Sequence, residues 1–206
     1  MEIVVATRNR HKLRELVALL KVRGIRWRSL QAFSRVPSVA ERAHSFEANA
    51  IAKARAVARA TGHLALADDS GLEVQALNGA PGVRSARFAG THCDDEANNH
   101  KLLQLLARVP LSRRHARYRC SLALVSPRGV VALTHGTWHG RIATHPKGRG
   151  GFGYDPIFCV PSLGKTVGEL PLRMKQRLSH RARAATPMRR VLQQLATAHR
   201  VKQVVE

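Results

Sequence analysis

Apolar and polar positions in the first part of this chain predict a strand, a helix and a second strand. Residues 2–6 form a short apolar run that is typical of a buried strand. The next apolar residues recur at the spacing of one helix face: Leu13, Leu16, Val17 and Leu20. Gly24 stands where helices often end, and a short strand is expected over residues 25–28.

A second helix is predicted after a loop over residues 31–44, which holds Pro37. Ser45 is suited to cap its first turn, where Glu47 interacts favourably with the helix dipole. The inward face is rich in small side chains: Ala50, Ile51, Ala54, Val57 and Ala58. We therefore expect this helix to pack closely against its neighbours.

The middle of the chain predicts more strands. Residues 64–67 form a compact apolar run that leads into Asp68 and Asp69, and a further strand is expected over residues 72–77. In α/β proteins, the ends of such strands hold the binding sites. The sequence therefore predicts that this strand end delivers carboxylates to a cleft.

The remaining segments complete the order of elements. Residues 118–125 and 130–133 are predicted to form a hairpin, because the turn between them holds a proline and a glycine that suit a type I turn. Helices are expected from Asp94 or Asp95 and in the last segment, where Pro187 should cause a break or kink near residue 186. This order predicts an α/β fold with one mixed sheet. The chain is expected to be a single domain, residues 1–206, whose two lobes surround a groove.

Composition adds a strong positive charge. The chain has 35 Lys and Arg but only 13 Asp and Glu, a net charge of +22, which attracts anions of every kind. A dedicated nucleic-acid surface clusters such charges among aromatic side chains, yet aromatics are only 4% and the arginines are scattered. We interpret the charge as a solvated basic surface, and weak non-specific nucleic-acid binding stays open as an alternative.

The sequence also predicts a cytoplasmic protein. Cys93, Cys120 and Cys159 show no paired spacing of a disulfide framework or a zinc site. The apolar run at the start is shorter than that of a secretory signal, and no later segment approaches membrane-spanning length.

Two segments in the first half hold candidate ligands for phosphate and metal. Residues 7–12 join a strand to a helix and offer N–H groups, a hydroxyl, an amide and a lysine, which suit a phosphate or form an ordinary helix cap. Glu41, Asp68 and Asp69 are notable because acids are scarce. Neighbouring strand residues point to opposite faces, so one of Asp68 and Asp69 orders the loop and the other can hold a metal with Glu41. The alternative is a turn.

Two further segments suit a nucleobase. Glycines surround Phe152 in residues 148–153, so that its ring could stack on a base, with Asp155 at the base edge. A hairpin with Phe152 in the core is the alternative. Lys175 and the run Ser179-His180-Arg181 fit an anion or base site, or else a capped helix with a basic first turn.

Together, and in this order, the segments resemble the inosine/xanthosine triphosphate pyrophosphatases over nearly the whole chain. The matching motifs are Thr7-x-Asn9-x-x-Lys12, Ser45-Phe46-Glu47-x-Asn49-Ala50-x-x-Lys53-Ala54, Ala67-Asp68-Asp69-Ser70-Gly71-Leu72, Leu77-Asn78-Gly79-Ala80-Pro81-Gly82-Val83, Gly151-Phe152-Gly153-Tyr154-Asp155-Pro156 and Ser179-His180-Arg181. The resemblance implies an elongated mixed sheet with flanking helices and a central nucleotide-binding cleft. It also implies a homodimer that uses Mg²⁺ to hydrolyse ITP, dITP or XTP to the monophosphate and pyrophosphate. A pyrophosphatase for another modified nucleotide, or a nucleic-acid-binding protein on the same scaffold, is the alternative.

The resemblance further implies a role for each matched residue. Residues expected to bind the triphosphate are Thr7, Asn9, Lys12, Lys53 and Ser70, and the intervening Arg8, Arg10 and His11 also count as substrate-binding. Residues expected to bind the base are Phe152, Gly153, Tyr154, Asp155, Lys175, His180 and Arg181. Glu41 and Asp69 are expected to share Mg²⁺, with Asp69 as the general base. The sequence departs from the family pattern at Arg42-Ala43, where Thr-Gly is common.

Overall fold

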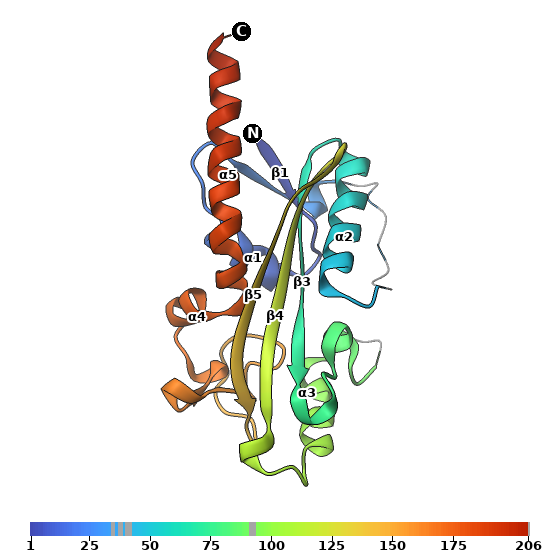
Figure 1. Ribbon diagram of the computed structural model, residues 1–206, viewed down its shortest axis with the longest axis vertical. Coiled ribbons are helices and arrows are strands. Elements are labelled where there is room, and N and C mark those ends of the chain that lie inside the picture. Colours follow the sequence, from blue (N-terminus) through green and yellow to red (C-terminus); the bar gives the residue numbers. More distant parts are fainter. Residues whose placement is uncertain (34–35, 37–38, 40–42, 91–93, 206) are drawn as a thin grey trace. The chain divides into compact units, whose positions relative to one another are not determined.

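The computed structural model describes the chain except residues 34–35, 37–38, 40–42, 91–93 and 206 and the side chains of residues 202–205 (Figure 1). Its helices are α1 (Arg10–Leu19), α2 (Phe46–Thr61), α3 (Asp95–Leu105), α4 (Leu172–Leu178) and α5 (His180–Val205). Its strands are β1 (Glu2–Val5), β2 (Arg26–Ser29), β3 (Leu64–Val74), β4 (His115–Ser126), β5 (Gly129–Ile142), β6 (Phe158–Val160) and β7 (Lys165–Thr166). None of these helices is both long and apolar enough to cross a membrane.

Within the described residues the strands form one mixed sheet in the order β2-β1-β3-β4-β5-β6-β7. Strand β1 runs parallel to β2 and β3, whereas β6 runs antiparallel to β5 and β7. The parallel pairs need helical crossovers, and α1 and α2 supply them. The predicted α/β class with a mixed sheet and flanking helices is confirmed.

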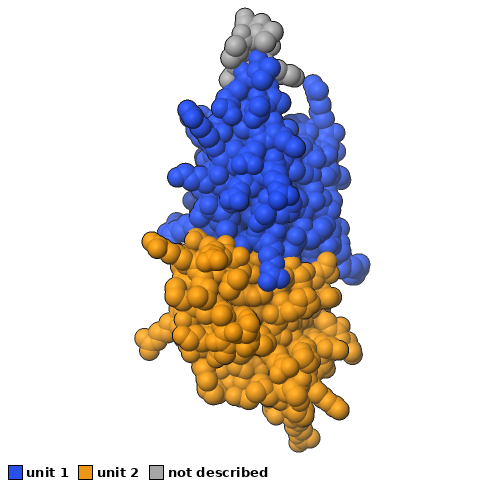
Figure 2. Space-filling model, turned by 60° about the vertical axis from the view of Figure 1, so that its left-hand side comes forward, with its two compact units in different colours: residues 1–69, 120–136, 181–206 blue, residues 70–119, 137–180 orange. Residues whose placement is uncertain are grey.

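The chain divides into two compact units (Figure 2). Unit 1 comprises Met1–Asp69, Cys120–Gly136 and Arg181–Glu206, and unit 2 comprises Ser70–Arg119 and Thr137–His180. The single domain with a cleft between two lobes stays a prediction.

The sheet of unit 1 is covered on both faces. Ile3 and Val5 are buried with residues of α1 and α5, such as Leu16 and Met188. Val4, the residue between them, is buried with the alanines of α2 instead. Because successive strand residues point to opposite faces, α1 and α5 cover one face and α2 covers the other, as Figure 1 shows for α5 and α2.

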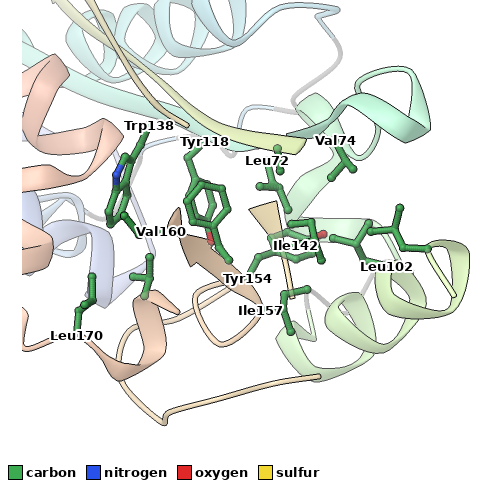
Figure 3. Close-up of a cluster of buried hydrophobic side chains, with 14 residues drawn as sticks. Leu72, Val74, Leu102, Tyr118, Trp138, Ile142, Tyr154, Ile157, Val160 and Leu170 are labelled. Atoms are coloured by element: carbon green, nitrogen blue, oxygen red, sulfur yellow. The ribbon is translucent and has the colours of Figure 1, made fainter. Parts of the chain in front are cut away.

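Unit 2 has a separate core that is richer in aromatic side chains. Tyr118, Trp138, Tyr154 and Phe158 are buried there with aliphatic residues such as Leu72 (Figure 3). The Tyr118 and Phe158 rings lie 4.5 Å apart between centroids. Large rings from β4, β5 and β6 therefore share one core with Tyr154, the residue that follows the glycine-rich segment.

Several predicted boundaries were wrong. The strand predicted to end before Asp68 continues as β3 to Val74, because its residues stay buried along that length. The hairpin strands β4 and β5 are longer than the predicted apolar runs, since their exposed faces carry polar residues. Of the break or kink expected near Thr186, the break is absent, since α5 continues through Pro187, and a kink stays a prediction. Ala184, Ala185, Met188 and Leu192 are buried on both sides of that proline, and this packing outweighs the lost hydrogen bond.

Candidate functional site

Residues 7–12 form a capped helix start. The Asn9 side chain accepts hydrogen bonds from the backbone N–H groups of His11 and Lys12 at 2.9 and 3.1 Å, and Thr7 Oγ1 accepts from Asn9 N at 3.2 Å. These backbone contacts are those of an ordinary helix cap, which was the alternative interpretation of the segment. Arg8, Arg10 and His11 are exposed, and phosphate binding by this segment stays a prediction.

Asp68 is the buried centre of a charged cluster in unit 1. Its Oδ1 lies 2.5 Å from Lys12 Nζ, and its Oδ2 accepts from Arg181 Nε at 3.0 Å and from the Cys120 thiol at 3.1 Å. Burial alone raises the pKa of Asp68, but the charges of Arg181 and Lys12 outweigh burial and hold this pKa well below its usual range. Asp68 is therefore an anion that fixes two cations in place.

Arg181 is buried in unit 1 and also binds Glu15, whose Oε2 lies 2.8 Å from Arg181 Nη1. Burial lowers the pKa of Arg181, but the negative charges of Asp68 and Glu15 outweigh burial and raise this pKa above its usual value. The guanidinium therefore stays charged. Sequence reasoning missed Glu15. The signal in the sequence is its position three residues after Lys12 on α1, which places both side chains on one helix face.

Asp69 binds a different cation. Its Oδ1 accepts a hydrogen bond from Lys53 Nζ at 2.7 Å, and the same Nζ donates to the backbone carbonyl of Asp68 at 2.7 Å. The side chains of these neighbouring acids on β3 thus have different lysine partners, Lys12 for Asp68 and Lys53 for Asp69. Ser70 follows in β3 and is partly buried. Glu41, the other predicted metal ligand, lies outside the described residues.

Asp155 is the corresponding buried acid of unit 2. Its Oδ2 accepts from the backbone N–H of Phe152 at 2.9 Å and from Lys175 Nζ at 2.5 Å, and its Oδ1 accepts from the Tyr118 hydroxyl at 3.2 Å. A Cβ at Gly151, where φ is +80°, would collide with the Asp155 carboxylate. The glycine-rich segment is therefore folded around this side chain.

Two predicted base-binding side chains touch each other in unit 2. Lys175 Nζ lies 4.3 Å from the centroid of the Phe152 ring, a cation–π contact. Phe152 is only partly buried, so the alternative in which Phe152 lies in the core was wrong. The ring is held next to an ammonium group that Asp155 also binds.

The neighbouring Gly153 and Tyr154 are tied into unit 2. Gly153 donates its N–H to Asp95 at 2.6 Å and accepts from Asn99 at 3.0 Å. The Tyr154 hydroxyl donates to the Ser85 carbonyl at 2.8 Å, and burial, together with the charge of Asp95, raises the pKa of Tyr154. These contacts anchor the segment and were not foreseen from the sequence.

His180 is buried and stacks on Tyr118, with centroids 4.5 Å apart and ring planes 13° apart. The structure thus gathers Phe152, Gly153, Tyr154, Asp155, Lys175 and His180 in unit 2. Arg181, which was expected among them, is held in unit 1 by Asp68 and Glu15. Its expected contact with a base stays a prediction.

Comparison with known proteins gives consistent matches along the chain. Residues 3–191 match the Ham1 family. A dITP/XTP pyrophosphatase of Desulforamulus reducens is 49% identical over 195 residues, covering 95% of this chain and 97% of that protein. A dITP/XTP pyrophosphatase of Geobacter sulfurreducens is 51% identical over 182 residues, 88% of this chain and 92% of that protein.

Solved structures match equally well. A HAM1 protein from Coxiella burnetii is 43% identical with a TM-score of 0.87, covering 94% of this chain and 99% of that one. A nucleoside-triphosphatase, dITP/XTP pyrophosphatase, from Mycobacterium abscessus is 44% identical with a TM-score of 0.76, covering 91% and 97%. The fold and the sequence therefore point to the same group of proteins.

Proposed function

This chain belongs to the Ham1 family, and we propose that it hydrolyses non-standard purine nucleoside triphosphates such as dITP, ITP and XTP to the monophosphate and pyrophosphate. The relatives named above support this proposal through identity over almost their whole length. The observation that carries it is the arrangement of adjacent acids on β3, in which Asp68 binds Lys12 and Asp69 binds Lys53. Fixed cations beside a carboxylate base suit hydrolysis of a polyanion.

The triphosphate is bound by cations that the protein already holds in position. The side chains of Lys12 and Lys53 are 19% and 15% exposed, so each keeps some surface toward solvent although an aspartate fixes it. A preorganised ammonium group neutralises phosphate charge without further ordering. The residues proposed to bind the triphosphate are Thr7, Arg8, Asn9, Arg10, His11, Lys12, Lys53 and Ser70.

Asp69 acts as the general base. It takes a proton from the water molecule that attacks the α-phosphorus, and the bond from that phosphorus to the oxygen of the leaving pyrophosphate breaks. Asp69 and Glu41 would hold Mg²⁺, which binds through one or two carboxylates plus substrate phosphates and neutralises charge on those phosphates. Asp69 fits this set because carboxylate oxygens are the hard donors that Mg²⁺ prefers, and its Oδ1 holds the Lys53 ammonium group beside them. Asp68, in contrast, binds Lys12, Arg181 and Cys120.

The base is bound by the unit 2 residues. Phe152 stacks on the purine with one face of its ring, while Lys175 Nζ contacts the ring at 4.3 Å from its centroid. A 6-keto purine offers an acceptor to a donor such as a backbone N–H group, whereas the 6-amino group of adenine places donor against donor. An unpaired buried donor costs about 1 to 3 kcal/mol, so discrimination of roughly tenfold or more is expected.

A substrate panel tests the proposed function. ITP, dITP, XTP, ATP and GTP are each incubated with Mg²⁺ or with EDTA, and monophosphate and pyrophosphate are both measured. We expect equal amounts of both products from ITP, dITP and XTP with Mg²⁺, and little from ATP or GTP. Orthophosphate with a nucleoside diphosphate, or nucleic-acid binding without turnover, would contradict the proposal.

The assembly and location are further parts of the proposal. We place a homodimer in the cytoplasm, where the nucleotide pool is, and the free thiols of Cys120 and Cys159 suit a reducing compartment. The net charge of +22 supports weak, salt-sensitive binding of nucleic acid in addition. Light scattering of the purified protein tests the dimer, and a monomer mass would remove that part.

A further inference from the structure

Tyr118 links two residues to which the proposed function gives a role at the base. It lies on β4 within unit 2, is only 6% exposed, and donates its hydroxyl to Asp155 Oδ1 at 3.2 Å. Its ring makes a second contact: it lies almost parallel to the His180 imidazole, with 4.5 Å between the ring centroids. One side chain therefore contacts both Asp155 and His180.

The hydroxyl of Tyr118 is not needed to fill space. The ring already packs against Phe158. It lies among the buried apolar side chains of unit 2 (Figure 3), where phenylalanine would supply the same apolar surface. A buried hydroxyl lowers stability unless it has a partner, and Asp155 is that partner. The contact thus commits one oxygen of Asp155 to β4, while the other binds Lys175 and the Phe152 backbone.

We propose that Tyr118 is a positioning residue for base recognition: its hydroxyl fixes the Asp155 carboxylate, and its ring fixes the plane of the His180 imidazole. This inference rests on the proposed function. Asp155 in turn binds Lys175 and the backbone of Phe152. A shift of the Asp155 carboxylate would therefore displace both Lys175 and Phe152. Tyr118 itself has no chemical step to perform.

Two substitutions separate the two contacts. Tyr118→Phe removes the hydroxyl and keeps the stacked ring, whereas Tyr118→Leu removes both. We expect Tyr118→Phe to raise KM for dITP and XTP about fivefold with kcat within about twofold, because the lost hydrogen bond acts on binding. Tyr118→Leu should raise KM about fivefold further. Phenylalanine thus rescues part of the loss.

Trp138→Phe is the matched control. Trp138 is buried in the same core and packs against the same Phe158 ring, at 5.7 Å between centroids. It should lower the melting temperature at least as much as Tyr118→Phe but leave KM near the wild-type value. An equal rise of KM in Trp138→Phe would reduce the effect to general loosening of the core and overturn the inference.

A double-mutant cycle shows whether Tyr118 acts through Asp155. In an Asp155→Asn background, Tyr118→Phe should change KM by less than about twofold, since its target is already altered. Independent, multiplicative effects on KM would overturn the inference, as would a wild-type KM for Tyr118→Phe. If the wild-type protein itself turns over none of the substrates, the proposed function fails instead, and the two failures are distinguishable.

Discussion

Three charged residues form a buried network inside unit 1. Glu15, Asp68 and Arg181 form a chain of contacts in which every member is at most 7% exposed. Such a network adds little when complete but costs much when one member is lost, because another charge is left buried without compensation. The same contacts also keep Arg181 in one orientation.

Glu15→Gln tests that network. The substitution preserves shape but removes the charge that faces Arg181, so we expect a loss of about 1 to 3 kcal/mol in the free energy of unfolding, measured by urea denaturation. Glu2→Gln is the control, since Glu2 pairs with the exposed Arg26 and the partly buried Arg28 at the surface, and the substitution should cost less than about 1 kcal/mol. Equal losses in both variants would contradict a special role for the buried network.

The depressed pKa of Asp68 predicts acid sensitivity. The unfolded chain takes up a proton on this carboxyl near its ordinary pKa, about 4, whereas the folded protein does so only at lower pH. This part of the stability is present above about pH 4 and is lost as the pH falls below it. Urea unfolding between about pH 6 and pH 3 should show a steeper decline for the wild type than for Asp68→Asn. Identical slopes would exclude Asp68 as a cause.

At the scale of elements, local pattern predicted the sheet and most helices but not where they end. Ser45 and Asp94 cap α2 and α3 as their side chains indicated. The end of β3 was missed because burial beyond Asp69 depends on residues distant in the sequence, such as Ser85, which binds the Leu72 backbone. Glu15 and Arg181 are 166 residues apart, and Tyr118 and Asp155 are 37 apart, so no local spacing could pair them.

Pro187 gives an element-scale prediction. Proline within α5 removes one backbone donor, and Pro187→Ala should restore it and raise the free energy of unfolding by about 1 to 3 kcal/mol. Thr197→Ala, at an exposed position of the same helix, should change it by less than about 1 kcal/mol. A neutral or destabilising effect of Pro187→Ala in thermal and urea unfolding would mean that α5 accommodates this proline without a cost in free energy.

The glycine-rich segment gives a second one. Gly151 and Gly164 both have positive φ, +80° and +62°, but only Gly151 has a side chain where a Cβ would stand, that of Asp155. Alanine at either position should cost about 1 kcal/mol in backbone strain. Gly151→Ala should in addition raise KM for dITP several-fold, because Asp155 must shift, and Gly164→Ala should not. Equal KM values for the two variants would contradict a role for Asp155 in substrate binding.

At the scale of the whole molecule, lysine and arginine far outnumber the acids and give a net charge of +22. Of the acids discussed, Glu15, Asp68, Asp69 and Asp155 are all buried and face lysine or arginine. The exposed surface is therefore far more positive than the clusters themselves. A tetra-anionic nucleotide is attracted to such a protein at long range, in addition to its contacts after binding.

Salt should weaken that attraction. Raising NaCl from about 20 to 300 mM shortens the screening length to about a quarter, so kcat/KM for dITP should fall several-fold while kcat changes little. The paired variant Arg55→Glu/Arg59→Glu reverses two exposed charges on α2 and leaves the charged clusters intact. It should have a lower kcat/KM at low salt and approach the wild type at high salt. If its kcat/KM equals that of the wild type at every salt concentration, the contacts of Lys12 and Lys53 alone account for the capture of substrate, and the remaining charge serves another purpose.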